Sequence, residues 1–167
     1  MASTVAITIE GVLAQGQADD LPNNKPIING LELYHGFKGM FKLALVTDCP
    51  DLDKVEHWTK MNGLIEHPYI IHSDFALNTQ DRVLQWEALK TTHGLALDLV
   101  VDSDPRLVKD AFDLGIPAML YMHPVYARPE FRPDFKQEIK PWGMIEEAIT
   151  QARLLKEQDP RRDADTA

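Results

Sequence analysis

The stretch Thr4-Val5-Ala6-Ile7-Thr8-Ile9-Glu10-Gly11-Val12-Leu13 decides the fold of this chain. Its apolar residues form a short run that ends at Gly11. Such a run near an N-terminus predicts a buried strand of a parallel sheet. The polar residues Thr8 and Glu10 lie at the carboxyl end of this strand, and in open α/β sheets that end borders the ligand-binding crevice. Both are therefore candidate site residues. Taken alone, the stretch also fits an edge strand with two solvated polar residues.

Four further apolar segments alternate with helical patterns along the chain. The segments begin near Leu43, Tyr69, Leu97 and Ala118. Caps and breakers predict four helices: from Asn29, from Asp51 to about Asn62, from Thr79 through Thr92, and from Pro105 to Gly115. The third should have Val83, Leu84, Trp86 and Leu89 facing inward, and Asp104 suits a cap of the fourth better than a ligand role. This alternation predicts an α/β fold, a three-layer sandwich with a five-stranded parallel sheet and the first strand near its centre.

The length of 167 residues suits one domain with a core of ordinary size. We assign residues 1–157 to this domain. Its last part is predicted as a proline-rich loop from His123 to Pro141 and a final helix from Trp142 to about Glu157. The charged tail, residues 158–167, is predicted to be disordered.

Composition narrows the function classes. The formal net charge of -9 argues against a broad nucleic-acid-binding face. The single cysteine, Cys49, allows no disulfide within the chain, which favours a reducing compartment. No targeting segment and no apolar run of membrane-spanning length is present, so we expect a cytoplasmic protein without a membrane partner, in the host cytoplasm if a phage encodes it.

Polar groups follow three of the predicted strands. They are Thr8 with Glu10, Thr47 with Asp48, and Asp102 with Asp104. Because parallel strands end at the same edge of a sheet, we expect these groups to gather there. Carboxylate oxygens suit a hard cation such as Mg²⁺, and hydroxyl groups with backbone amides suit a phosphate.

These motifs, in this order, resemble the haloacid dehalogenase-like (HAD) phosphohydrolase superfamily. The first motif of that family, Asp-x-Asp-Gly-(Val/Thr)-Leu after an apolar strand, corresponds to Thr8-Ile9-Glu10-Gly11-Val12-Leu13. The second corresponds to L-A-L-V-T ending at Thr47, and the third to a basic residue, Arg82 or alternatively Lys90. The fourth corresponds to L-D-L-V-V-D-S-D followed by a helix and G-I-P, with Asp102 as the acid.

The order and spacing of the motifs are most similar to those of the phosphatase domain of polynucleotide kinase-phosphatases and of related actinobacteriophage proteins. The segment from His123 to Asp134 carries the similarity to the actinobacteriophage proteins. No long insert follows the first or third strand, so no large cap domain is expected. The resemblance implies that Thr8 stands in the position of the nucleophile and that Glu10 stands in the position of the acid/base. It also implies that Thr47 and Arg82 bind the phosphate and that Glu10 and Asp102 bind a Mg²⁺ ion.

The chain departs from the family at its first motif, because Thr8 and Glu10 replace two aspartates. A threonine hydroxyl stays protonated at neutral pH and needs activation, whereas a carboxylate nucleophile does not. Thr8 also removes a negative charge that would help to hold Mg²⁺, so weak or absent Mg²⁺ binding is expected.

Three functions remain open at this point. The first is a HAD-fold pseudoenzyme that binds a protein partner or a phosphorylated ligand. The second is a Mg²⁺-dependent phosphatase that acts on nucleotides or on nucleic-acid 3′-phosphate ends. The third is a structural or assembly protein of a phage.

Overall fold

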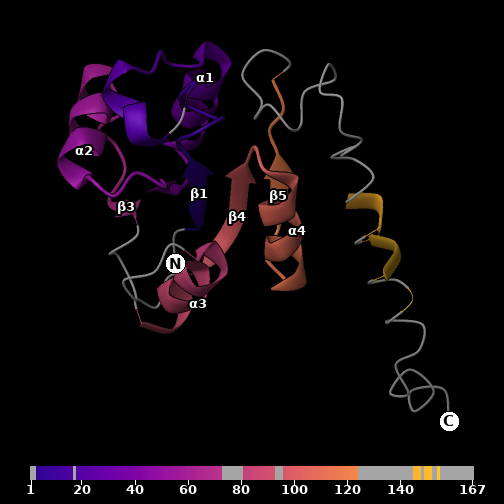
Figure 1. Cartoon of the computed structure of the whole chain (residues 1–167). Coiled ribbons are helices and arrows are strands. Elements are labelled where there is room, and N and C mark those ends of the chain that lie inside the picture. The colour runs from indigo at the N-terminus through magenta and orange to yellow at the C-terminus, as the bar shows by residue number, and fades with distance from the viewer. Residues whose placement is uncertain are drawn as a thin grey trace, which may run out of the picture.

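The computed structural model describes residues 3–16, 18–72, 81–92, 96–123, 145–147, 149–151 and 154. The predicted tail and almost all of the predicted loop from His123 to Pro141 lie outside these residues. The described chain runs through the following elements, most of which Figure 1 labels: β1 (Thr4–Thr8), η1 (Ala18–Asn23), α1 (Ile28–Phe37), β2 (Lys42–Val46), α2 (Leu52–Met61), β3 (Tyr69–Ile71), α3 (Arg82–Thr92), β4 (Leu97–Asp102), α4 (Pro105–Asp113) and β5 (Ala118–Leu120).

The five strands form one sheet in the order β3-β2-β1-β4-β5. Every pairing between neighbours is parallel. The prediction of a parallel sheet with β1 at its centre is therefore confirmed. This order places the carboxyl ends of β2, β1 and β4 side by side, which brings three of the sequence motifs to one edge.

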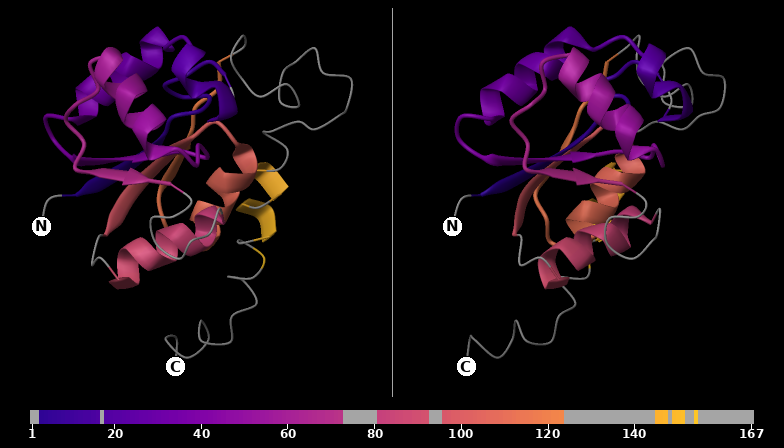
Figure 2. Two further views of the ribbon diagram at one scale, coloured as in Figure 1. Left: turned by 60° about the vertical axis from the view of Figure 1, so that its left-hand side comes forward. Right: turned by 90° about the vertical axis from the view of Figure 1, so that its left-hand side faces the viewer.

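Helices cover both faces of the sheet, as the two views in Figure 2 show, with α1 and α2 on one side and α3 and α4 on the other. Alternate residues of β1 face opposite sides of the sheet. Val5 and Ile7 pack in a cluster that includes Tyr34 and Trp58, whereas Ala6 packs in a second cluster that includes Trp86. The central strand is thus buried on both faces, which explains its nearly continuous apolar sequence.

The predicted caps of α2 and α4 are confirmed. The side chain of Asp51 accepts a hydrogen bond from the backbone N–H of Lys54, and that of Asp104 accepts one from Arg106. Gly63, one residue beyond the C-cap of α2, has a φ of 73°, a left-handed conformation that glycine adopts without strain.

Three local predictions are wrong. The first helix begins at Ile28 with Ile27 as its N-cap, so Asn29 does not cap it. The third helix begins at Arg82, and Asp81 accepts hydrogen bonds from the first-turn N–H groups, whereas Thr79 lies outside the described residues. Of the residues predicted to face inward on α3, Trp86 and Leu89 are buried, whereas Leu84 is 41% exposed. Among the described residues, no helix has the length and apolar character that crossing a membrane requires.

Candidate functional site

The candidate site lies at the carboxyl edge of the sheet. Thr8 is the last residue of β1, and Asp102 is the last residue of the neighbouring strand β4. Glu10 follows β1 by two residues, and Thr47 directly follows β2 on the other side. All four residues are buried, with at most 6% of each exposed. The parallel topology therefore brings together the strand-end residues that the sequence singles out.

Two hydroxyl–carboxylate pairs make up the centre of the site. The Thr8 hydroxyl donates a hydrogen bond to Oδ2 of Asp102 over 2.5 Å. The Thr47 hydroxyl donates to Oε1 of Glu10 and accepts a hydrogen bond of 3.0 Å from the backbone N–H of Cys49. The carboxylates of Glu10 and Asp102 thus each accept a hydrogen bond from a threonine hydroxyl of the site.

Burial raises the pKa of both carboxyl groups. The pKa of Glu10 rises to about 7, chiefly because burial disfavours its charged form, and the hydrogen bond from Thr47 offsets part of this rise. The pKa of Asp102 is also raised by burial, against the hydrogen bonds from Thr8 and from the backbone of Asp104. Near neutral pH, Glu10 therefore exists as a mixture of its neutral and charged forms.

Arg82 supplies the positive charge of the site. Its side chain is only 3% exposed, and its guanidinium donates to Asp48 over 2.5 Å and to Gln85 over 2.8 Å. Its Nε has no hydrogen-bond partner among the described residues. The guanidinium also lowers the pKa of Glu10 and of Asp102, so one cation lies within electrostatic reach of both carboxyl groups.

The structure thus brings Arg82, the preferred basic residue of the third motif, to the site. The alternative, Lys90, lies two turns farther along α3, and its side chain is outside the described part of the chain. The sequence analysis missed the ion pair of Arg82 with Asp48 and the contact with Gln85. The position of Asp48 directly after Thr47 was the one available signal for this pair.

The loop after β1 holds Glu10 in place. Gly11 has a φ of 86°, and a Cβ atom built on it would lie 2.1 Å from Oγ of Ser103. The Ser103 hydroxyl donates a hydrogen bond to the backbone oxygen of Glu10 over 3.2 Å. The first motif therefore needs glycine at position 11 for its backbone conformation and for its close approach to the β4–α4 turn.

These residues fit a strong Mg²⁺ site poorly. Among the described residues, no three histidine, cysteine, aspartate or glutamate side chains form a group that could hold a metal ion. The two candidate ligands, Glu10 and Asp102, each accept a hydroxyl hydrogen, and burial favours their protonated forms. A carboxylate binds a metal in its deprotonated form, so these conditions oppose Mg²⁺ binding.

Comparisons with known proteins found similarity in structure alone. No protein-family model matches the chain, and no curated protein sequence matches it. A chain of the Pnkp1/Rnl/Hen1 RNA repair complex superposes with a TM-score of 0.61 and 12% identity, over 72% of this chain and 42% of that chain. This chain therefore spans less than half of that neighbour.

Two other neighbours match over nearly their whole length. A haloacid dehalogenase-like family hydrolase from Streptococcus pneumoniae has a TM-score of 0.60 and 8% identity, over 86% of this chain and 97% of that one. A HAD family enzyme from Bacteroides thetaiotaomicron, an Asp-to-Ala mutant in complex with magnesium and inorganic phosphate, has a TM-score of 0.52 and 11% identity, over 84% and 98%. The chain therefore has the haloacid dehalogenase-like fold.

Proposed function

We propose that this chain is a HAD-fold pseudoenzyme that binds a phosphorylated ligand at the carboxyl edge of its sheet without hydrolysing it. The observation that carries the proposal is the hydrogen bond from the Thr8 hydroxyl to Asp102. In a phosphatase of this kind, the residue at position 8 would have to attack phosphorus, and in this chain that residue is Thr8, which offers a neutral hydroxyl. Both oxygens of Asp102 already accept hydrogen bonds, Oδ2 from this hydroxyl and Oδ1 from the backbone N–H of Asp104.

Arg82 supports binding of an anion. It is a buried cation with an unpartnered Nε, and it lies within electrostatic reach of both carboxyl groups. When Glu10 takes up a proton, the negative charge next to Arg82 falls, and a phosphate meets less repulsion. The raised pKa of Glu10 places this change near neutral pH.

The same value of the Glu10 pKa favours a second candidate, a Mg²⁺-dependent phosphatase. A general acid/base works best when its pKa lies near the working pH, and about 7 meets that condition. This candidate still lacks a carboxylate nucleophile at position 8. Its substrates would be nucleotides or nucleic-acid 3′-phosphate ends, as the sequence layout suggests.

Calorimetry and an activity assay on the same sample separate the two candidates. We expect inorganic phosphate to bind to the unmodified protein, and Arg82→Gln to weaken this binding at least about tenfold, since it removes a charge-assisted contact. Arg106→Gln is the matched control, because this arginine is paired with Asp104 on the exposed side of α4.

On p-nitrophenyl phosphate with Mg²⁺, we expect no turnover above that of a blank. Metal-dependent turnover that Asp102→Asn abolishes would refute the pseudoenzyme and establish the phosphatase. Absence of phosphate binding in both the unmodified protein and the control would refute the proposed ligand class.

A further inference from the structure

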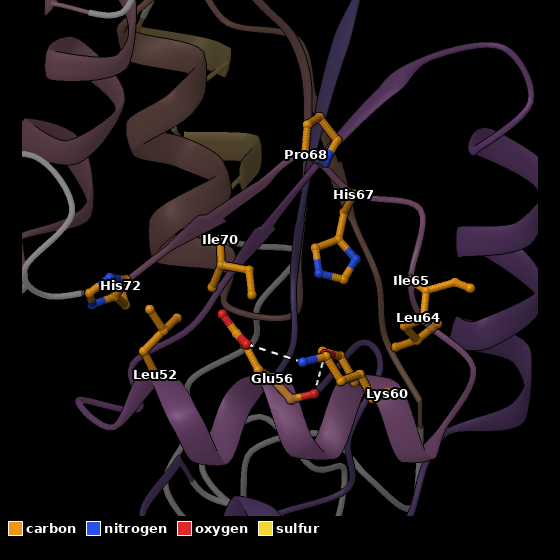
Figure 3. A pocket seen from close by; sticks show the side chains of 10 residues that line it. Leu52, Glu56, Lys60, Leu64, Ile65, His67, Pro68, Ile70 and His72 are labelled. Atoms are coloured by element: carbon orange, nitrogen blue, oxygen red, sulfur yellow. Dashed lines mark hydrogen bonds and ion pairs between the residues drawn. The ribbon is translucent and has the colours of Figure 1, made fainter.

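A cavity of about 460 Å³ lies between α2 and the edge strand β3, and Thr8, Glu10, Thr47 and Asp102 do not line it. Figure 3 shows it from close by. Its apolar lining includes Leu52, Leu64 and Ile70, and its polar lining includes Glu56, Lys60 and His67. The volume falls within the range of about 300–1,000 Å³ in which proteins bind small molecules.

Hydrogen bonds behind the cavity fix the tautomer of His67. The backbone N–H of Glu66 donates to the Tyr34 hydroxyl over 2.9 Å, so this hydroxyl oxygen acts as an acceptor there. We assign the hydroxyl proton as the donor to Nδ1 of His67, 3.0 Å away, since this direction gives the proton an acceptor among the described residues. Nδ1 of the neutral ring is thereby the acceptor, and the ring proton lies on Nε2. Burial lowers the pKa of His67, which keeps the ring neutral.

The other face of the cavity carries a balanced ion pair. Nζ of Lys60 lies 3.3 Å from Oε2 of Glu56, one turn earlier on α2. Figure 3 shows the His67 ring pointing into the cavity towards this pair. The Glu56 carboxylate also acts on His67, whose pKa it raises slightly against the effect of burial. The lining therefore offers an N–H donor and a carboxylate acceptor close together, with no net charge.

We propose that this cavity binds an uncharged aromatic heterocycle in which a carbonyl group and an N–H group are neighbours. The carbonyl oxygen would accept from Nε2–H of His67, and the N–H group would donate to Glu56. The apolar body of the ring would pack against Leu52, Leu64 and Ile70. An anion fits less well, since the Glu56 carboxylate faces the same space and Lys60 is already paired with it.

The test uses 2-quinolone as the probe, with amide NMR spectra and ¹⁵N spectra of the histidine rings of the full chain as the readout. We expect saturable shifts at Leu64, Ile70 and the His67 ring nitrogens, with a Kd of about 1 mM, an affinity typical of a ligand with few atoms. The analogue 1-methyl-2-quinolone keeps the carbonyl and lacks the donor. It should bind at least about threefold more weakly, the effect of one lost hydrogen bond.

Two variants locate the site. Leu52→Trp should fill the cavity and abolish binding, whereas Leu84→Trp, an exposed control on α3, should leave binding unchanged. His67→Phe should weaken binding by removing the donor, and thermal unfolding of each variant shows whether it folds.

The proposal is refuted if 2-quinolone causes no saturable shift at these residues, or if Leu52→Trp binds as tightly as the unmodified protein. It is also refuted if the same amide signals shift with protein concentration alone, since the cavity would then belong to an interface between two copies. Phosphate binding at the carboxyl edge of the sheet does not affect any of these outcomes.

Discussion

Replacing Glu10 with glutamine should stabilise the protein at alkaline pH and leave its stability almost unchanged under acid conditions. Glu10 is 6% exposed, and its pKa rises from 4.5 to about 7 on folding. The folded state therefore holds this proton more tightly than the unfolded state does. Stability from Glu10 is fully present below pH 4.5 and is lost as pH rises through about 7.

The size of the effect follows from the pKa difference. A rise from 4.5 to about 7 corresponds to about 3 kcal/mol of lost stability once Glu10 is fully ionised. Glutamine keeps a neutral acceptor for the Thr47 hydroxyl, as protonated Glu10 does, and the pKa of about 7 already includes the effect of this hydrogen bond on the charged form. The net gain in the free energy of unfolding should thus be about 3 kcal/mol at pH 8 and close to zero at pH 4.5.

Urea unfolding of both proteins at pH 4.5, 6, 7 and 8 measures this difference. Asp102 also has a raised pKa, so the unmodified protein loses stability through both groups, and the difference between the two proteins isolates Glu10. Glu32→Gln on the exposed side of α1 is the control for a change of net charge. A difference that is independent of pH, or a Glu10→Gln protein that is less stable at pH 8, would refute burial as the cause of the shift.

Three further predictions concern the same edge of the sheet. Sulfate, whose charge does not change between pH 6 and pH 8, should bind more tightly at pH 6 in the unmodified protein, because Glu10 repels the anion once it is ionised. Calorimetry should find this difference smaller in Glu10→Gln. The double variant Thr8→Asp with Glu10→Asp should have a lower melting temperature than the unmodified protein in EDTA, and Mg²⁺ should raise it. The reason is that an aspartate at position 8 would place its carboxylate against that of Asp102, where a hydrogen bond of 2.5 Å now lies. Gly11→Ala should destabilise the protein by more than about 1 kcal/mol in urea unfolding, whereas Gly36→Ala, in an exposed turn of α1 with open space at its Cβ, should be neutral or stabilising.

The sequence predicted the sheet well because the information for it is local. Each strand is a short apolar run, and the run of β1 has apolar residues for both faces. The caps Asp51 and Asp104 were also predictable, since a side chain at an N-cap needs only the backbone two or three residues ahead. The cap of α1 was mispredicted because its N-cap, Ile27, makes no side-chain hydrogen bond and leaves no pattern in the sequence.

The positions of the site residues were predictable, whereas their pairing was not. Parallel topology alone brings Thr8, Glu10, Thr47 and Asp102 to one edge. Which hydroxyl donates to which carboxylate depends on the register of β1 against β2 and β4, and a period-two pattern carries no such information. The partner of Arg82 depends on the path of the chain into α3, which no local rule supplies.

The pairing of Thr8 with Asp102 has a physical consequence for the stability of this edge of the sheet. An aspartate in place of Thr8 would face Asp102 across about the distance of one hydrogen bond, and two buried carboxylates that close together cannot both ionise without a cation between them. A threonine removes that need, because its hydroxyl satisfies the Asp102 carboxylate in the absence of any metal. The Thr47 hydroxyl does the same for Glu10. The edge of the sheet can thus remain buried and folded without Mg²⁺, with Arg82 as its one buried cation among the described residues. The anion-binding role that we propose rests on this balance of charge without a metal and on the positive charge of Arg82 beside Glu10.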